Sequence, residues 1–450
     1  MIPLVKSLSQ NNNVTFFYIA KRDLPPNLGP NISYIQTNIN VRDEGRRDFL
    51  TLLQFRKTMH SFDINPVFIA GDIILGHIIE YHMEKILEVL NQEWDLVILD
   101  ELFGMHAHTF AIILNRLKKV PYIVFSTTLM VETTSSNMAL SRPWTSKPCM
   151  FSPIPEHPQD WFDPQTFYYR TYNFFQNLMD IIWVGHFSPL SFTNMPRMLG
   201  HSFNWMDFYQ KSSFSLSDTI DSIIYPMPEG SDRKTIGRHC DQAKKLEGEF
   251  LKFVEDPNSK GTIYIAFGSL ILLDMAPENF LKSIFDALEE LDEYRIIFSY
   301  NGPPRKTKTH IFLTKWAPQK EILNHPTTRV YLTHGGLKSI KESICAKTPP
   351  IVMPFFAEQA HNAHFILDSG VGSILNKYKI SKELVLNTFQ EVLENPSYKK
   401  NMERLHAIYL DTIIPPLDEG RFYVEKETLM MAPFLVINKK FQKGKVHLLP

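Results

Sequence analysis

The sequence predicts an α/β protein of two domains, each with a parallel sheet covered by helices. In both halves of the chain, short apolar runs typical of buried strands alternate with amphipathic helices, which is the pattern of βαβ units. A polar, irregular stretch at 215–260 separates the two series and is the natural linker. The length of 450 residues also exceeds one typical domain.

Composition narrows the class of protein. Hydrophobic residues make up 44% of the chain, which is enough for sizeable cores and excludes a disordered protein. The formal net charge of −1 gives no global field that would favour a nucleic acid partner or an anionic membrane. Cys149, Cys240 and Cys345 lack both metal-ligand spacing and the density of a disulfide framework, so each is expected to be a buried or idle thiol.

The first half contains one clear βαβ unit. Residues 95–99 (DLVIL) are typical of a buried parallel strand, and the strand ends at Asp100. The other expected elements are the end of a helix at 1–9, strands at 14–20, 33–36 and 122–126, and helices at 75–91 and 105–117. The carboxyl ends of parallel strands face the ligand crevice, so Asp100 is a candidate functional residue. Alternatively, Asp100 begins the next helix as its cap.

Aromatic side chains are concentrated between residues 151 and 214. Their mixed spacing predicts helices that pack over the N-terminal sheet, with most of the rings in the core. The residues concerned are Trp161, Phe162, Phe167, Tyr168, Tyr169, Tyr172, Phe174, Phe175 and Trp183.

The second half repeats the alternation of strands and helices. A strand at 262–267 ends at Gly268-Ser269, a helix follows at 277–291, and the next strand lies at 295–299. Amphipathic helices are expected at 381–393 and 398–410, and another at 417–431 after a proline pair.

The segment 312–372 contains the most informative turn. A buried-type strand at 329–333 ends at His334-Gly335-Gly336, and apolar residues then follow at helical spacing. Glycines let the backbone approach a ligand, and a helix start offers unpaired N–H groups, so the turn suits a phosphate. The turn alone is equally consistent with an ordinary strand-to-helix connection.

The residues around this turn follow a known order. Trp316-Ala317-Pro318-Gln319 lies upstream, Glu342 follows the glycines, and Pro354-Phe355-Phe356-Ala357-Glu358-Gln359 lies downstream. This order and spacing resemble the signature block of the UDP-glycosyltransferases, specifically the animal UDP-glucuronosyltransferase family. The resemblance implies a glycosyltransferase B (GT-B) fold, in which two Rossmann-like domains face each other and a C-terminal helix crosses back.

The resemblance also implies roles for individual residues in holding a UDP-sugar. Trp316 would stack on the uracil, Gln319 would bind its edge or the ribose, and Glu342 would accept from the ribose hydroxyls. The diphosphate would bind at Ser269, His334, Gly335, Gly336 and Ser339, and the sugar at Glu358 and Gln359. No metal or other cofactor is expected. Two residues depart from the family pattern. Lys338 stands where relatives have a small residue or Asn, and either contacts a phosphate or crowds the site. Glu358 stands where they have Asp.

Catalysis in the resembled family is an inverting displacement in which a His removes the proton of the acceptor and an Asp orients that His. Asp100 occupies the Asp position. Met1-Ile2-Pro3-Leu4 already lies inside the family's pattern, so the His would precede Met1, and poor transfer is expected of the chain as it stands. His106 and His108 are candidate substitutes, although packing roles are the simpler expectation for both.

The expected partners follow from the same resemblance: UDP-glucuronic acid or UDP-glucose, a small lipophilic acceptor, and a membrane in the endoplasmic reticulum. No signal peptide or eighteen-residue apolar window is visible in the sequence. Two glycosylation sequons begin at Asn13 and Asn31 and could be used in that lumen.

The expected domain boundaries are an acceptor domain at 1–214 that lacks its first strand and loop, the linker at 215–260, the UDP-sugar domain at 261–412, and a cross-over helix with a basic tail at 413–450. Two hypotheses remain at this stage. One is a UDP-glycosyltransferase, and the other is a non-catalytic relative or incomplete gene product that keeps nucleotide-sugar binding.

Overall fold

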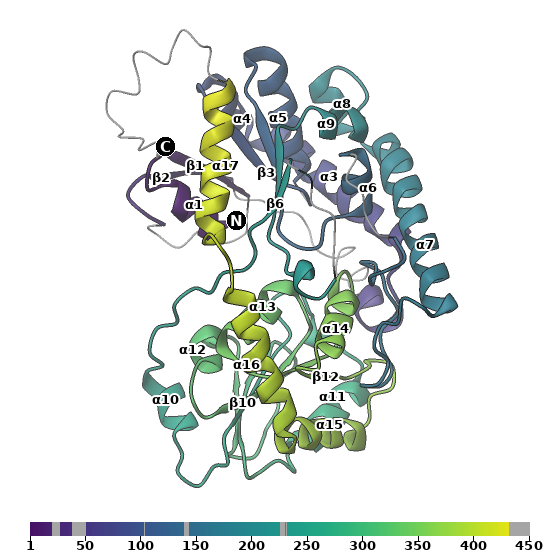
Figure 1. The fold of residues 1–450 in the computed structure, drawn as a ribbon, viewed down its shortest axis with the longest axis vertical. Helices are drawn as coiled ribbons and strands as arrows, with labels where there is room; N and C mark the ends of the chain where they lie inside the picture. The colour runs from purple at the N-terminus through teal and green to yellow at the C-terminus, as the bar shows by residue number, and fades with distance from the viewer. Residues whose placement is uncertain are drawn as a thin grey trace.

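The computed structural model describes residues 1–19, 28–37, 51–102, 104–138, 144–225, 230 and 232–431. Two α/β halves lie one above the other, and the chain crosses between them after β6 and again between α16 and α17 (Figure 1). The basic tail expected after residue 431 lies outside the described residues.

The C-terminal half is built on a six-stranded sheet in which every paired strand is parallel, in the order β12-β11-β10-β7-β8-β9. Its strands are β7 (Thr262–Ala266), β8 (Arg295–Ser299), β9 (Ile311–Thr314), β10 (Thr328–Thr333), β11 (Pro350–Val352) and β12 (Ser373–Ile374). Its helices are α10 (Gly248–Val254), η6 (Leu273–Met275), α11 (Glu278–Leu288), α12 (Gln319–Leu323), α13 (Leu337–Ala346), α14 (Gln359–Asp368), α15 (Lys382–Glu394) and α16 (Pro396–Leu410). Helices cover both faces of this sheet and bury its strands. This burial explains why the strands are apolar runs that could be recognised in the sequence.

The N-terminal half contains a four-stranded parallel sheet, β3-β4-β5-β6, and a separate parallel pair, β1-β2. The strands are β1 (Val14–Ile19), β2 (Ile32–Thr37), β3 (Val97–Asp100), β4 (Tyr122–Ser126), β5 (Phe214–Ser217) and β6 (Arg233–Thr235). The helices are α1 (Ile2–Leu8), η1 (Leu52–Arg56), η2 (Ser61–Ile64), α3 (Asn65–Tyr81), α4 (Met83–Asn91), α5 (Met105–Lys118), α6 (Glu132–Asn137), α7 (Phe167–Ile182), η3 (Trp183–Phe187), η4 (Ser188–Ser191), α8 (Asn194–Leu199), α9 (Trp205–Gln210) and η5 (Asp221–Ile223).

The expected linker at 215–260 is shorter in the structure. β5 and β6 lie inside that stretch and complete the N-terminal sheet, and α10 packs with the C-terminal half through Val254. The polar residues of this stretch indicated a linker, but β5 is a short strand whose serines are fully buried. The connection between the halves is therefore confined to the residues between β6 and α10.

Two of the three cysteines form a disulfide. Cys240, in the connection between the halves, is bonded to Cys345 near the end of α13, and Cys149 is a buried free thiol. The expectation of an idle thiol is therefore wrong for Cys240 and Cys345. Their sequence separation of 105 meant that no spacing rule could predict the pairing.

The last described helix, α17 (Pro416–Met431), returns to the N-terminal half and packs against α1 (Figure 1). Val424 of α17 shares a core with Leu4 and Leu8 of α1 and with residues of the N-terminal sheet. The two halves are thus tied at their connection and again at the end of the described chain.

One stretch, residues 61–81, is long and apolar enough to cross a membrane by length and composition, although the sequence was expected to contain none. Its inner residues Phe68, Leu75 and Ile78 are buried in the N-terminal core. Asp72 on the same helix accepts hydrogen bonds from the backbone N–H groups of Asn194 and Met195. These contacts make the stretch a packed helix of the N-terminal half.

The aromatic segment does not pack as expected. Phe162 is buried, but Trp161, Phe167, Tyr168, Phe174, Phe175 and Trp183 are all exposed to solvent by 37% or more of their surface. The polar residues of α7 take the inner face instead, because Asn173 and Asp180 are the ones with hydrogen-bond partners there.

Candidate donor site and facing carboxylate

Three neighbouring strands of the C-terminal sheet end at the same edge. β7, β10 and β11 are adjacent in the sheet, with Thr333 of β10 paired to Ala266 of β7 and to Val352 of β11. The loops that follow them hold Ser269, His334 and Glu358. The strand order therefore brings together three segments that are far apart in the sequence, at the edge where α/β sheets bind ligands.

The turn after β10 requires glycine for two reasons. Gly335 has a φ of 85°, and a Cβ atom at that position would lie 2.5 Å from Val352 Cγ1. A Cβ atom on Gly336 would lie 2.5 Å from His334 Nε2. Gly336 is the N-cap of α13, so the turn leads directly into the helix start. The predicted order of strand, glycine turn and helix is confirmed.

The imidazole of His334 lies in a narrow space between glycines. A Cβ atom on Gly268 would be 3.0 Å from its Cε1 atom, so the loop before Ser269 also makes room for the imidazole. Burial lowers the pKa of His334 to about 4, which leaves the ring neutral at physiological pH. Its Nδ1 atom has no hydrogen-bond partner among the described residues. A buried polar atom without a partner is costly, so this atom favours a ligand that bonds to it.

Gln319 and Glu342 form a pair beside this turn. The Gln319 Nε2 atom donates to Glu342 Oε2, and Tyr264 Oη lies 3.4 Å from Gln319 Oε1. Burial raises the pKa of Glu342, while the Gln319 hydrogen bond and nearby Lys320 oppose that rise. Two residues that the sequence assigned to the ribose are therefore in contact, and each has its functional group fixed by the other.

Trp316 lies in the loop after β9, with 72% of its surface exposed. Its backbone is fixed by the Thr314 hydroxyl, which donates to the Trp316 carbonyl over 2.8 Å. A core role for this indole is therefore excluded. A large exposed ring on an anchored loop provides a flat face for a base.

The remaining predicted donor residues are Gln359, Glu358 and Ser339, and each contacts other parts of the protein. Gln359 is buried, and its Oε1 atom accepts from the backbone N–H groups of Phe355 and Phe356 over 2.8 and 3.1 Å. Burial raises the pKa of Glu358, and the Thr128 hydroxyl and the N–H of Leu337 counteract that rise. Ser339 is 8% exposed in the first turn of α13. Gln359 thus shapes the loop, and Glu358 lies between the α13 start and the N-terminal half.

Asp100 faces this site from the end of β3. Its Oδ1 atom accepts from the N–H of Leu102 over 2.9 Å, and the following helix α5 has Gly104 as its N-cap. Asp100 is therefore not a helix cap. Burial raises its pKa, whereas Thr127, the amino group of Met1 and Lys338 of the donor domain act in the opposite direction. Carboxylate, chain start and Lys338 thus lie close together between the two halves.

His106 and His108 have packing roles. The His106 ring lies 5.7 Å from Phe17, and burial lowers its pKa to about 3. His108 is fully buried against Phe208 and Trp205, with Nδ1 3.0 Å from the Gly104 carbonyl. Both rings are packed among core side chains, and the described residues contain no group of ligands fit for a metal ion.

Sequence reasoning missed two carboxylates that contact basic side chains across the halves. Lys341 of α13 pairs with Asp218, which follows β5. His361 of α14 lies 3.0 Å from Asp221, and Lys147 lies 3.2 Å from the same carboxylate. Lys341, one residue before Glu342, was the available signal for the first of these contacts, because a charged residue on the buried side of a helix needs a partner.

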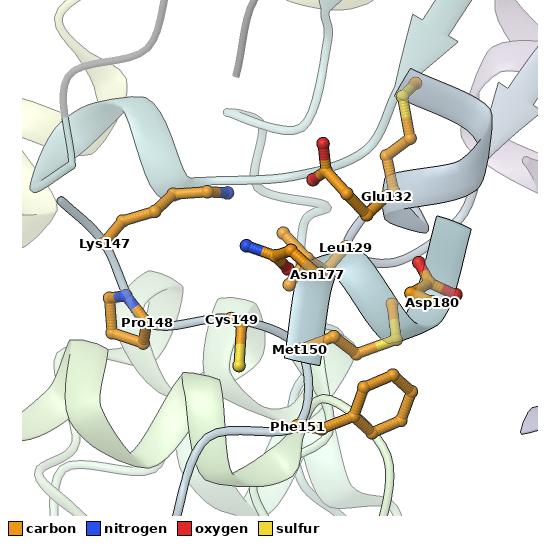
Figure 2. A pocket seen from close by; sticks show the side chains of 10 residues that line it. Leu129, Glu132, Lys147, Pro148, Cys149, Met150, Phe151, Asn177 and Asp180 are labelled. Carbon is orange, nitrogen blue, oxygen red and sulfur yellow. The ribbon is translucent and has the colours of Figure 1, made fainter. Parts of the chain in front are cut away.

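A separate pocket lies beside the loop that follows β4 (Figure 2). Its apolar wall includes Leu129, Met150 and Phe151, and Figure 2 shows the polar groups of Glu132, Lys147 and Asn177 turned toward one another above it. None of the predicted donor residues lines this pocket. Its free volume of about 20 Å³ has room for roughly one water, so it is a small cavity and not a ligand-sized pocket.

Comparison with known proteins agrees with this geometry. Residues 84–431 match the model of the family described as UDP-glucoronosyl and UDP-glucosyl transferase. Human UDP-glucuronosyltransferase 1A8 is 30% identical over 280 residues, which cover 62% of this chain and 52% of the relative. Human UDP-glucuronosyltransferase 1A10 is 27% identical over 348 residues, 77% of this chain and 63% of the relative. The chain thus spans about half to two thirds of the length of these relatives.

Solved structures show the fold. Phytolacca americana UGT2, complexed with UDP-2fluoro-glucose and pterostilbene, superposes with a TM-score of 0.58 at 16% identity and covers 95% of this chain and 96% of its own. The spinosyn forosaminyltransferase SpnP has a TM-score of 0.58 at 14% identity, with 95% of each chain covered. The predicted GT-B fold is confirmed. With the family model matching most of its length, the chain belongs to the UDP-glucoronosyl and UDP-glucosyl transferase family.

Proposed function

We propose that the protein transfers a hexosyl group from a UDP-sugar to a hydroxyl group of a small lipophilic acceptor, with inversion at the anomeric carbon. One observation carries the proposal: His334, whose buried Nδ1 atom has no hydrogen-bond partner among the described residues, lies beside the Gln319–Glu342 pair at the strand ends that face Asp100. Family membership supports the donor class, and the sugar is either glucuronic acid or glucose.

The donor would lie along the edge of the C-terminal sheet. The uracil stacks on Trp316, and Gln319 and Glu342 exchange part of their mutual contact for the ribose hydroxyls. The diphosphate receives a hydrogen bond from neutral His334, the backbone N–H groups at the α13 start, and the Ser269 and Ser339 hydroxyls. Lys338 is exposed beside the same helix start and adds a positive charge. Glu358 would bind the sugar, and Gln359 would hold its loop.

The reaction breaks the bond between the anomeric carbon and the diphosphate oxygen as the acceptor oxygen attacks from the opposite face. UDP leaves with the bonding electrons, and the helix start stabilises its charge. The acceptor proton goes to a base oriented by Asp100. We place that base beside the start of α1, because the amino group of Met1 lies near Asp100.

We also propose that the protein works in the lumen of the endoplasmic reticulum. The Cys240–Cys345 disulfide suits an oxidising compartment, and the sequon residues Asn13 and Asn31 are both exposed. Treatment of the protein from a secretory-pathway host with an N-glycosidase should increase its gel mobility. An unchanged mobility would remove the support that the sequons give.

The direct test is a transfer assay with a phenol acceptor and either UDP-glucuronic acid or UDP-glucose. Product should form with one donor, and His334→Ala should lower the rate by about 10²-fold or more, because a preorganised donor at the leaving group is lost. His325→Ala, a half-buried His in the same domain, serves as the control. Equal rates for both variants would contradict the proposed role of His334.

A further inference from the structure

His361, in the first turn of α14, is fully buried and has an oxygen atom beside each of its two ring nitrogens. Its Nδ1 atom lies 2.8 Å from the carbonyl oxygen of Pro148, and its Nε2 atom lies 3.0 Å from Asp221 Oδ1. A carbonyl oxygen can only accept a hydrogen bond, so Nδ1 must be the donor to Pro148. A neutral imidazole has a single N–H group, which Nδ1 already uses. The short contact between Nε2 and Asp221 therefore needs a second proton.

Lys147 favours a carboxylate, and hence a charged ring, in this contact. Its Nζ atom lies 3.2 Å from Asp221 Oδ2, so the other oxygen of the same carboxyl group has a cation beside it. A neighbouring cation favours the ionised form of a carboxyl group, which leaves the second proton on His361. Burial raises the pKa of Glu358 and of Asp368, and the charge of His361 acts in the opposite direction on both. Two further carboxyl groups thus lie near the imidazolium.

The contact joins the two halves of the molecule. Lys147 and Pro148 lie on the segment between α6 and α7, and Asp221 begins η5, so all three belong to the N-terminal half. His361 belongs to the C-terminal half. Figure 2 shows Lys147 and Pro148 on one extended segment that runs beside helices of the C-terminal half, drawn in green. The N-terminal half therefore supplies both oxygens that hold the ring.

The same turn of α14 is part of the candidate donor site. Glu358, the residue expected to bind the sugar, is the N-cap of α14 and precedes His361 by three residues, so the two lie on one side of the helix. Asn362 Nδ2 donates to the Gly335 carbonyl over 2.8 Å, which joins this turn to the glycine turn where the diphosphate is expected. A single helical turn thus connects the N-terminal half with both expected positions.

A second basic side chain holds the loop before α14. Lys377 Nζ donates to the Leu53 carbonyl over 3.1 Å and also to the Phe355 carbonyl. Leu53 belongs to η1 of the N-terminal half, and Phe355 lies in the loop that leads to Glu358. The segments on both sides of Glu358 are therefore held against the N-terminal half.

We propose that His361 is a positioning residue for the donor sugar: its charged ring, held by two oxygens of the N-terminal half, fixes Glu358 where the sugar binds. The UDP part of the donor would be bound by residues within the C-terminal half, such as Trp316 and Glu342, so it does not need this link. Loss of the link should weaken binding of the sugar and leave that of UDP. This role rests on the proposed function, because it takes Glu358 as the residue that binds the sugar.

The test is isothermal titration calorimetry of the purified chain with UDP, UDP-glucose and UDP-glucuronic acid. His361→Ala should keep the Kd for UDP within about twofold of the wild type and raise the Kd for the UDP-sugar about tenfold or more, because Glu358 loses the position from which it accepts hydrogen bonds. His361→Gln keeps one donor and should fall between the two. His310→Ala is the matched control and should change neither Kd, since His310 is buried in the same half and its Nε2 atom bonds to the Leu288 carbonyl within that half.

Asp221→Asn perturbs the other end of the contact. It should raise the Kd for the UDP-sugar in the same way, and combined with His361→Ala it should add little, because the two residues act through one contact. An unchanged Kd for the UDP-sugar in His361→Ala, or an equal rise in the Kd for UDP, would overturn the proposal. If His361→Ala does not fold, the same outcomes in His361→Gln and Asp221→Asn decide. A wild-type chain that does not bind UDP would instead contradict the proposed function on which this role rests.

Discussion

Removal of the Glu342 carboxylate tests the donor site most sharply among single substitutions. The carboxylate is held by Gln319 Nε2, so it is already positioned to accept from the ribose hydroxyls. A hydrogen bond to a charged group is worth about 1.5–3 kcal/mol. Burial raises the pKa of Glu342, which means that part of its desolvation cost is present before the ligand binds. Loss of one such bond therefore gives a conservative estimate for Glu342→Ala.

That free energy corresponds to a rise of about 10- to 150-fold in the Kd for UDP, which isothermal titration calorimetry resolves. Glu342→Gln should fall between wild type and Ala, because a neutral hydrogen bond is worth about 0.5–1.5 kcal/mol. Glu249→Ala, an exposed carboxylate in the same half, serves as the control. A Kd for Glu342→Ala within twofold of the wild type would refute the assignment of this residue to the ribose.

Three further outcomes are expected. Removal of the disulfide with Cys240→Ser and Cys345→Ser should lower the free energy of unfolding by about 2–4 kcal/mol, since it closes a loop of more than 100 residues; denaturant unfolding with no difference from wild type would contradict this. Burial lowers the pKa of His108 to about 4, so the unfolded chain binds the proton first, and stability should fall as pH drops from about 6.5 toward 4, by up to about 1.4 kcal/mol per pH unit. Because His106, His334 and His364 also have lowered pKa values, His108→Leu should make that pH profile shallower without flattening it, and an unchanged slope would count against the assignment. An N-terminal extension that places a His just before Met1 should raise transfer by about 10²–10⁴-fold; a matched extension with Ala there should not, and equal rates would show that another group is the base.

The donor half was the part that sequence could predict well. β7 and β10 are apolar runs that lead into glycine-containing turns, and His334-Gly335-Gly336 has backbone requirements that no other residue type meets at Gly335. Backbone requirements of this kind can be recognised from residues that are adjacent in the sequence. The family pattern assigned Gln319 and Glu342 to the nucleoside, but their mutual contact was not predicted.

Other features depend on contacts that no local pattern contains. The 105-residue separation of Cys240 and Cys345 gives no motif, and β5 is a strand because it completes a sheet. In α7 the aromatic residues were expected to be mostly in the core, because the usual rule assigns apolar side chains there. The structure reverses that rule because Asn173 and Asp180 find hydrogen-bond partners inside the domain.

The most direct measurement for the account as a whole is a crystal structure of the chain with UDP. The account predicts the uracil on the Trp316 indole, the ribose at Glu342 and the diphosphate against His334 and the N-terminus of α13. UDP bound elsewhere on the chain, or a Trp316 that remains free of the base while UDP is bound, would contradict it.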